Sequence, residues 1–387
     1  MKIAVTTLGF CVTSLLVLGL VMLYSSSMVM VDTTDKLTHS LVGAKMLRSQ
    51  LLWCALGLVA CVVTASLDYA VLRKLVWPIF ICTLVLAALV FVPHLGLRIN
   101  GARRWIKMPG ATFQPSEMVK IGLIITVAWY AEKSQRKMNT FVRGLVVPGV
   151  IIGSALGLVF IEPDRGTTIL MAGVTMTMLL LAGVRWWHLI LVGLVGGTLL
   201  CASILHDPMR LNRVMAYLHP EAHLSGAALQ AEEAKKAIGA GGLTGVGLGN
   251  GLQKNGFVPE IQSDFIFANI GEELGLVATI FVVAAFFVIA CCGIQIARQA
   301  RDQFGCLLAV GVTALISYQA IINMGVVTSL LPNKGLALPF ISAGGSSLLA
   351  MLTGVGLLIS VARQASALKI PATGLAPEAN PFAAKAT

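Results

Sequence analysis

The sequence has little charge for its length. Only 12% of its 387 residues are Asp, Glu, Lys or Arg, whereas 57% are hydrophobic and the mean hydropathy is +0.87. An ordinary soluble domain carries about twice that charged fraction, so a soluble globular protein is excluded. The solvent for most of the chain must be lipid. Because no linker interrupts the sequence, we predict one integral membrane domain over residues 1–370.

The spacing patterns of metal and redox sites are also missing. Eight cysteines lie in or beside apolar runs, with no CxxC pair and no cluster of histidines. Cysteines in such surroundings are typical of small buried hydrophobic residues. We therefore predict no dedicated metal site.

Long apolar segments make up most of what remains. A membrane-spanning helix needs ~20 mostly apolar residues, and about ten segments qualify. The fold class predicted is therefore all-α, a polytopic membrane helix bundle. The expected spans are Ile3–Ser25, Gln50–Leu67, Val76–Val92, Pro115–Tyr130, Leu145–Ile161, Thr167–Gly183, Trp187–Leu205, Phe265–Cys292, Phe304–Met324 and Ser346–Val361.

The loops on the two sides of such a bundle differ in kind. The odd-numbered loops are long or unusual, and the largest, about residues 206–264, lies between spans seven and eight. The even-numbered loops are short and basic, which favours the cytoplasmic side for them and for both termini. The Ala- and Pro-rich tail 371–387 is expected to be disordered there. The net charge of +11 suggests an anionic partner, but not nucleic acid, because no soluble basic domain is present.

Two outer loops carry cations close to the membrane. Arg103 and Arg104 flank Trp105 in the second odd loop, and Arg210 and Arg213 open the fourth. Guanidinium groups bind phosphate oxygens in bidentate fashion, and Trp favours the headgroup region. Either a phosphate-bearing ligand or ordinary lipid headgroups would satisfy these side chains.

An acid and a lysine stand at the start of the fourth span. Glu117 and Lys120 are three residues apart, so they can pair on one face of a helix. Glu117 also suits the first turn of a helix, where an acid is favourable. A lysine one turn into an apolar span is costly, so Lys120 either snorkels to the surface or faces a polar interior.

Asp264 lies at the mouth of the eighth span. A carboxylate kept ionised beside a membrane cavity suits general-base catalysis, although an ordinary helix cap is the alternative. Glu272 and Glu273 follow about eight residues further along, and we expect them to brace the bundle.

Three other stretches are polar or broken. The turn Glu162–Arg165 crowds two acids and a cation, as an internal ion pair or as part of a cavity. The glycine-rich stretch 239–251 is either a flexible connector or a site of close backbone approach. Residues 323–347 are apolar but interrupted by Pro and Gly, like a re-entrant segment, and include the lone cation Lys334.

Six motifs occur in one order between Leu97 and Val361. They are NGARRW, QPSExxK, EPDxGT, AIGxGGLxGxGLGxG, PExxxDFIFAxIGEELG and LPxKGxxLPFIS-GGSS. Together they closely resemble the SEDS family (shape, elongation, division and sporulation), and within it the FtsW branch more than the RodA branch. The sequence departs from the family pattern in three places: Arg165 stands where Leu is common, Gln262–Ser263 replaces His-Thr, and Ala343 replaces Tyr.

The resemblance implies a peptidoglycan glycosyltransferase that polymerises lipid II at the outer face of the bacterial cytoplasmic membrane during cell division. It implies a class B penicillin-binding protein (a transpeptidase) and other divisome membrane proteins as partners. Undecaprenyl pyrophosphate would be the leaving group. A divalent cation, Mg or Mn, could assist its departure, although the sequence offers no dedicated site.

The resemblance also implies roles for individual residues. Asp264 would be the general base, with the Glu117–Lys120 pair nearby. The residues expected to bind substrate are Glu117, Lys120, Arg103, Arg104, Trp105, Arg210, Arg213, Glu260 and Lys334.

Three other functions are weighed against this one. A RodA-like elongation polymerase would share the chemistry. A lipid II flippase needs charged groups exposed alternately to both faces, which the one-sided placement of the motifs disfavours. A scaffold for the transpeptidase would not need Asp264 for polymer synthesis.

Overall fold

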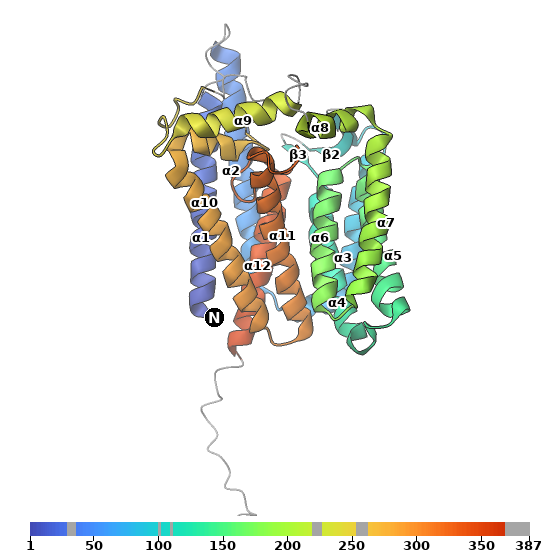
Figure 1. Ribbon diagram of the computed structural model, residues 1–387. Helices are drawn as coiled ribbons and strands as arrows, with labels where there is room; N and C mark the ends of the chain where they lie inside the picture. The colour runs from blue at the N-terminus through green and yellow to red at the C-terminus, as the bar shows by residue number, and fades with distance from the viewer. Residues whose placement is uncertain (29–35, 100–101, 109–110, 219–226, 253–261, 368–387) are drawn as a thin grey trace, which may run out of the picture.

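The computed structural model describes residues 1–28, 36–99, 102–108, 111–218, 227–252 and 262–367 (Figure 1). Its α-helices are α1 (Lys2–Met28), α2 (Lys36–Ser66), α3 (Tyr69–Ala88), α4 (Ser116–Ser134), α5 (Val147–Ile161), α6 (Arg165–Leu181), α7 (Trp186–Leu205), α8 (Pro208–Leu218), α9 (Ala227–Gly241), α10 (Ile266–Arg298), α11 (Gln303–Val327) and α12 (Gly345–Ala367). Short 3₁₀ or π turns cover Leu89–Phe91, Gln135–Lys137 and Val142–Val146. The strands are β1 (Gly96–Ile99), β2 (Ala102–Met108) and β3 (Ala111–Phe113).

Ten of the twelve α-helices in the described part of the chain run along the axis of one bundle, whereas α8 and α9 lie across its upper end (Figure 1). Eight of the ten are long and apolar enough to cross a membrane by themselves. The other two are α6, which is only 17 residues long, and α4, which carries charged residues. The predicted all-α membrane bundle is confirmed.

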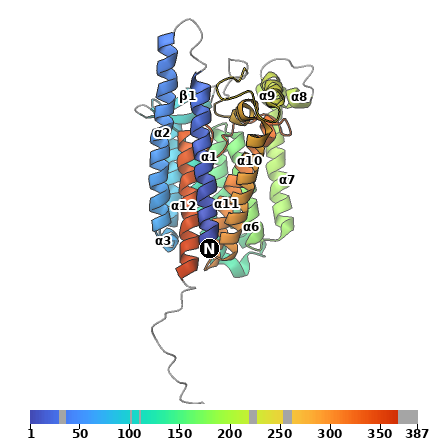
Figure 2. The ribbon, with the colours of Figure 1, turned by 90° about the vertical axis from the view of Figure 1, so that its left-hand side faces the viewer.

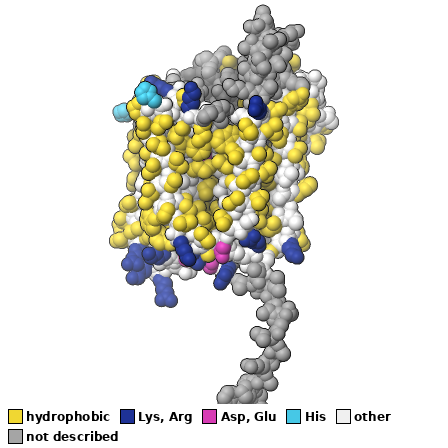
Figure 3. Space-filling view, turned by 180° about the vertical axis from the view of Figure 1, so that it is seen from behind, with side chains coloured by type: hydrophobic (Ala, Val, Ile, Leu, Met, Phe, Trp, Pro, Cys, Tyr) yellow, Lys and Arg dark blue, Asp and Glu magenta, His cyan; other side chains and the backbone are white. Residues whose placement is uncertain are grey.

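The surface and the interior divide as a bilayer requires. Figure 3 shows a belt of hydrophobic side chains between two ends where Lys and Arg gather. The helices α11 and α12 are the most buried of the candidate spans, and α7 is the least. We therefore expect the buried polar side chains of the bundle to lie where α11 and α12 contact neighbouring helices.

The two ends of the bundle are unlike each other. The first residue of α1 and the last turn of α12 lie at the same end, and α8, α9 and the small sheet lie at the other (Figures 1 and 2). The three strands form an antiparallel sheet in the order β1-β2-β3. This sheet was not expected for an all-α chain. Its strands of four, seven and three residues are too short to give a clear periodic signal.

The glycine-rich stretch packs tightly on an interruption in α10. Gly275 has φ 76° inside that helix, and a Cβ there would stand 2.4 Å from the backbone nitrogen of Gly245. The carboxylate of Glu273 accepts hydrogen bonds from Ser25 Oγ (2.5 Å) and Gly249 N (3.2 Å). Glu272 Oε1 accepts one from Leu252 N at 2.7 Å.

These bonds fix what the two motifs do in the fold. The two glutamates brace the bundle, as expected, and the close backbone approach of the glycines is to α10. The N-terminal part of α10, which directly follows Asp264, is thereby tied to α1 and to the glycine-rich stretch.

Candidate active site

Asp264 lies in the turn immediately before α10, at the end of the bundle that carries α8 and α9. Its side chain is half-buried. The N-cap position of α10 is Phe265, whose side chain makes no capping hydrogen bond, and Asp264 stands one position before it.

The segment between α11 and α12, residues 328–344, passes beside this carboxylate, and we call it the wall. Gly335 approaches so closely that a Cβ on it would stand 2.8 Å from Asp264 Oδ2. Asn323, on α11, donates one hydrogen bond to the carbonyl oxygen of Asp264 (2.8 Å) and another to that of Leu336 (2.7 Å). The acid and this segment are therefore held together by both a packing contact and a shared amide.

Lys120 is buried inside the bundle and does not reach the surface. Its side chain is 0% exposed, and Nζ lies 2.8 Å from Glu117 Oε1 and 3.0 Å from Gln319 Oε1. The snorkelling alternative is therefore wrong. Gln319 in turn donates to the carbonyl oxygen of Ala337 at 2.8 Å, which links the acid–lysine pair to the wall beside Asp264.

The Glu162–Arg165 turn reaches the same wall from another side. Asp164 caps α6 through hydrogen bonds from the backbone nitrogen (3.1 Å) and hydroxyl (3.0 Å) of Thr167. Gln114, which precedes α4, donates to Asp164 Oδ2 at 3.1 Å. Gly166 faces Leu336, since a Cβ on it would lie 3.2 Å from Leu336 Cγ.

Arg104 extends from β2 onto this turn. Its guanidinium donates to the carbonyl oxygens of Glu162 (3.2 Å) and Pro163 (2.5 Å), and it lies 3.9 Å from Asp164 Oδ1. The cation that pairs with the turn thus comes from the small sheet. About 30% of the Arg104 side chain stays exposed.

Glu162 is a fully buried acid beside Arg104 and Asp164. Within the described residues, neither carboxylate oxygen has a hydrogen-bond partner. Burial, and then the charge of Asp164, raise the pKa of Glu162 to about 8 against the opposing effect of Arg104. This side chain therefore holds a proton at neutral pH.

Lys334 precedes Gly335 in the wall and is half-buried. Burial lowers the pKa of its ammonium group. The neighbouring Asn333 donates to Gln230 Oε1 at 3.1 Å, which ties this part of the wall to α9. Lys334 thus stands one residue from the contact with Asp264.

The other expected residues are less closely placed. Arg103 is exposed on β2, and Trp105 is half-buried opposite Leu97 of β1. The residues Arg210 and Arg213 belong to α8, at the same end of the bundle, but their side chains are not among those described. Glu260 lies outside the described residues. The substrate-binding role of all these residues remains a prediction.

Several polar residues of this site were not singled out from the sequence. Gln319 and Asn323 are buried amides four residues apart in an apolar helix. Such side chains are costly inside a membrane span, which was a usable signal. Gln114 lies inside the QPSExxK motif, but its partner Asp164 is 50 positions away.

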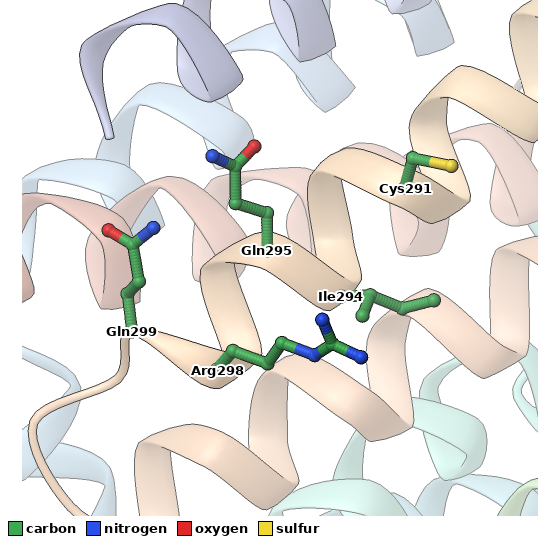
Figure 4. Close-up of a pocket in the computed structure, with 5 residues that line it drawn as sticks. All are labelled: Cys291, Ile294, Gln295, Arg298 and Gln299. Atoms are coloured by element: carbon green, nitrogen blue, oxygen red, sulfur yellow. The ribbon is translucent and has the colours of Figure 1, made fainter.

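A hollow elsewhere on the molecule does not belong to this site. Figure 4 shows it lined by Cys291, Ile294, Gln295, Arg298 and Gln299, all in or just after the last turns of α10. Asp264 precedes the first turn of the same helix, and the part of α10 after its interruption at Gly275 alone separates the two places by roughly 30 Å at ~1.5 Å per residue. The chemistry-bearing residues therefore lie at the opposite end of the bundle.

A metal ion has no evident ligand set here. Among the residues that the structure describes, no three His, Cys, Asp or Glu side chains are grouped so as to hold one.

Comparison with known proteins gives one consistent answer. Residues 6–367 match the model of the FtsW/RodA/SpoVE family, described as "Cell cycle protein". The "Probable peptidoglycan glycosyltransferase FtsW" of Trichlorobacter lovleyi is 40% identical over 94% of this chain and 93% of its own. "Stage V sporulation protein E" of Bacillus subtilis is 38% identical over 90% and 94%.

Solved structures agree with these relatives. A chain from "Structural coordination of polymerization and crosslinking by a peptidoglycan synthase complex" has a TM-score of 0.76 and 27% identity, and covers 92% of this chain and 97% of its own. The rod shape determining protein RodA of Thermus thermophilus has a TM-score of 0.66 and 26% identity, over 92% and 96%. The resemblance read from the six motifs is confirmed.

Proposed function

The chain belongs to the FtsW/RodA/SpoVE family of cell cycle proteins, and on that premise we propose that it is a peptidoglycan glycosyltransferase that polymerises lipid II. Relatives that match nearly the whole chain carry the name of that activity. The observation that carries the proposal is that one short segment, Gly335–Ala337, lies against Asp264 and is also contacted by α6 and α11. Asn323 of α11 bonds both Asp264 and Leu336, and Gly166 of α6 faces Leu336. Gln319 of α11, the partner of Lys120, bonds Ala337.

In this proposal Asp264 is the general base. It takes the proton from the 4-hydroxyl of the acceptor sugar as that oxygen attacks the anomeric carbon of the donor. The bond between the anomeric carbon and the pyrophosphate oxygen breaks, and undecaprenyl pyrophosphate departs with the bonding electrons. The products are a glycan strand longer by one disaccharide unit and a protonated Asp264.

The developing charge on the leaving group needs cations. Lys334 is one residue from the Asp264 contact, and the Arg104 side chain is partly exposed. Both are suited to stabilise pyrophosphate oxygens, with Arg103, Arg210 and Arg213 as further candidates. Lys120 is engaged by Glu117 and Gln319, so its first contribution is to hold the wall in place. Trp105, Glu117 and Glu260 complete the proposed substrate-binding set.

The chain is a multi-pass membrane protein, and its orientation is part of the proposal. Both termini would lie in the cytoplasm and the site at the outer face of the bacterial cytoplasmic membrane. In support, the first residue and the last helix share one end of the bundle, and Asp264 lies at the other (Figure 1). We take residues 1–370 as a single domain.

The partner proposed is a class B penicillin-binding protein, together with other divisome membrane proteins. A structural neighbour comes from a peptidoglycan synthase complex that coordinates polymerisation with crosslinking, which supports such an assembly. Relatives named FtsW support a role in division over the RodA-like alternative in elongation.

The test uses the purified chain with its transpeptidase partner and fluorescent lipid II, and resolves the products on a gel. Glycan strands that depend on this chain are expected. A chain that moves lipid II across vesicle membranes without forming strands would be a flippase. Strand synthesis that persists when this chain is left out would make it a scaffold, and either outcome overturns the proposal.

A further inference from the structure

Asn323 is a buried amide near the C-terminal end of the apolar helix α11. It is 1% exposed, and it lies one helical turn beyond Gln319 on α11. Burying an amide inside a membrane bundle costs free energy unless its hydrogen bonds are made. The hydrogen bonds of Asn323 therefore indicate which segments this side chain holds together.

Both amide hydrogens of Asn323 are used, and they go to different parts of the chain. One hydrogen bond reaches the carbonyl oxygen of Asp264, before α10, and the other reaches that of Leu336, in the wall after α11. Since both partners are acceptors, only the NH₂ group can face them. In the described residues, Asn323 Oδ1 has no partner, so the donor side alone fixes the side chain.

The two segments that Asn323 joins are also in direct contact. Gly335 precedes Leu336 and faces Asp264 Oδ2 with no room for a methyl group. The hydrogen bond from Asn323 to Leu336 and the contact of Gly335 with Asp264 are therefore one residue apart in this segment. A shift of either segment would change the distance from the carboxylate to Gly335 and to Lys334.

We propose that Asn323 is a positioning residue that sets the register between Asp264 and the segment that carries Lys334 and Gly335. This inference rests on the proposed function, in which Asp264 is the base and Lys334 faces the leaving group. A displacement of about 1 Å in a reacting group can lower a rate about 100-fold. Asn323 acts on the reaction through Asp264 and touches no substrate.

The experiment compares Asn323→Asp and Asn323→Ala with the native chain, each bound to the transpeptidase and supplied with lipid II. The aspartate keeps the shape but removes both donors. We expect kcat to fall at least tenfold while KM for lipid II stays within about twofold. The control is Asn250→Asp, an exposed amide that donates to the carbonyl of Val246 at 3.2 Å, which should keep its rate.

A double-mutant cycle separates positioning from a loss of folded enzyme. In the native background, Gly335→Ala should lower kcat strongly, because its methyl meets Asp264 Oδ2. In the Asn323→Ala background the wall is released, so the same substitution should cost several-fold less. If Gly335→Ala lowers kcat by the same factor in both backgrounds, to within twofold, the proposal is overturned. An unchanged kcat in both Asn323→Asp and Asn323→Ala would also overturn it.

A second measurement does not depend on activity. Hydrogen exchange at the backbone amides of residues 336–342 should become at least tenfold faster in Asn323→Ala, and unchanged exchange there would contradict the proposed role of Asn323 in holding this segment.

If Asn323→Asp or Asn323→Ala does not fold, Asn323→Ser, which keeps one donor, replaces it in the double-mutant cycle. If the native chain has no polymerase activity, the proposed function is wrong. If the native chain is active and the Asn323 variants have the same kcat, only this inference is wrong.

Discussion

Gly335 and Asp264 are packed so closely that a methyl group on the glycine would stand 2.8 Å from the carboxylate oxygen Oδ2. Gly335→Ala should therefore push the carboxylate or the wall aside. We expect the rate of lipid II polymerisation to fall at least tenfold, with little change in the thermal unfolding midpoint, because the displaced groups are at the site and not in the packed core.

The control for this substitution is Gly239→Ala. Gly239 lies on α9, and a Cβ there would meet nothing within 4 Å. Its rate should be unchanged and its stability equal or slightly higher, since Ala favours a helix over Gly. Equal rates for the Gly335 and Gly239 variants would contradict the contact.

Breaking the buried pair on α4 should destabilise the bundle. Lys120→Met removes the cation and leaves Glu117, which is 5% exposed, without it. Removing one member of a buried ion pair typically costs about 3–5 kcal/mol. We expect a clearly lower unfolding midpoint in detergent micelles and loss of polymerisation.

The matched variant is Lys120→Met combined with Glu117→Gln. It removes both charges, so most of the stability should return. A double variant as unstable as Lys120→Met alone would show that the pair is not the cause.

Glu162 should make stability fall as the pH rises. Its pKa is raised from 4.5 to about 8, so between these values the folded protein keeps a proton that the unfolded chain has released. The free energy of unfolding then decreases with pH by up to about 1.4 kcal/mol per pH unit, and levels off above pH 8.

Glu162→Gln should remove this contribution. Unfolding midpoints measured from pH 5 to 9 should fall less steeply in Glu162→Gln than in the native chain. Glu232→Gln, on the exposed face of α9, serves as the control. Identical slopes in the native and Glu162→Gln chains would contradict the buried, protonated state.

Asn269 is a buried amide without hydrogen-bond partners for its side chain among the described residues. It is 0% exposed on α10, and in the described part of the chain neither of its side-chain polar atoms has a partner. Asn269→Leu, which has nearly the same shape, should stabilise the protein by about 1–3 kcal/mol. Thermal unfolding checks this, and a lower midpoint would show that the amide is bonded after all.

Much of the fold could be predicted from hydropathy alone. Long apolar runs located the ten helices of the bundle, eight of which are long and apolar enough to cross a membrane by themselves in the described part of the chain. The short strands were missed because they span few residues between two spans. The extension of α10 to Arg298 was also missed, since its last turn is polar.

The site was predictable in its residues but not in its connections. Motif resemblance pointed to Asp264 and to the acid–lysine pair. The sequence could not choose between a snorkelling and a buried Lys120, because the deciding partner, Gln319, is 199 positions away. Likewise, the bond from Asn323 to Asp264 joins residues 59 positions apart.

The most direct test of the account is the polymerisation rate of Asp264→Asn. The amide keeps the size of the side chain but cannot accept the proton of the acceptor hydroxyl. In a folded, partner-bound sample with fluorescent lipid II, we expect at least a 100-fold loss of glycan strands, while Glu232→Gln retains the native rate. Strand synthesis by Asp264→Asn at the native rate would contradict the assignment of Asp264 as the catalytic base.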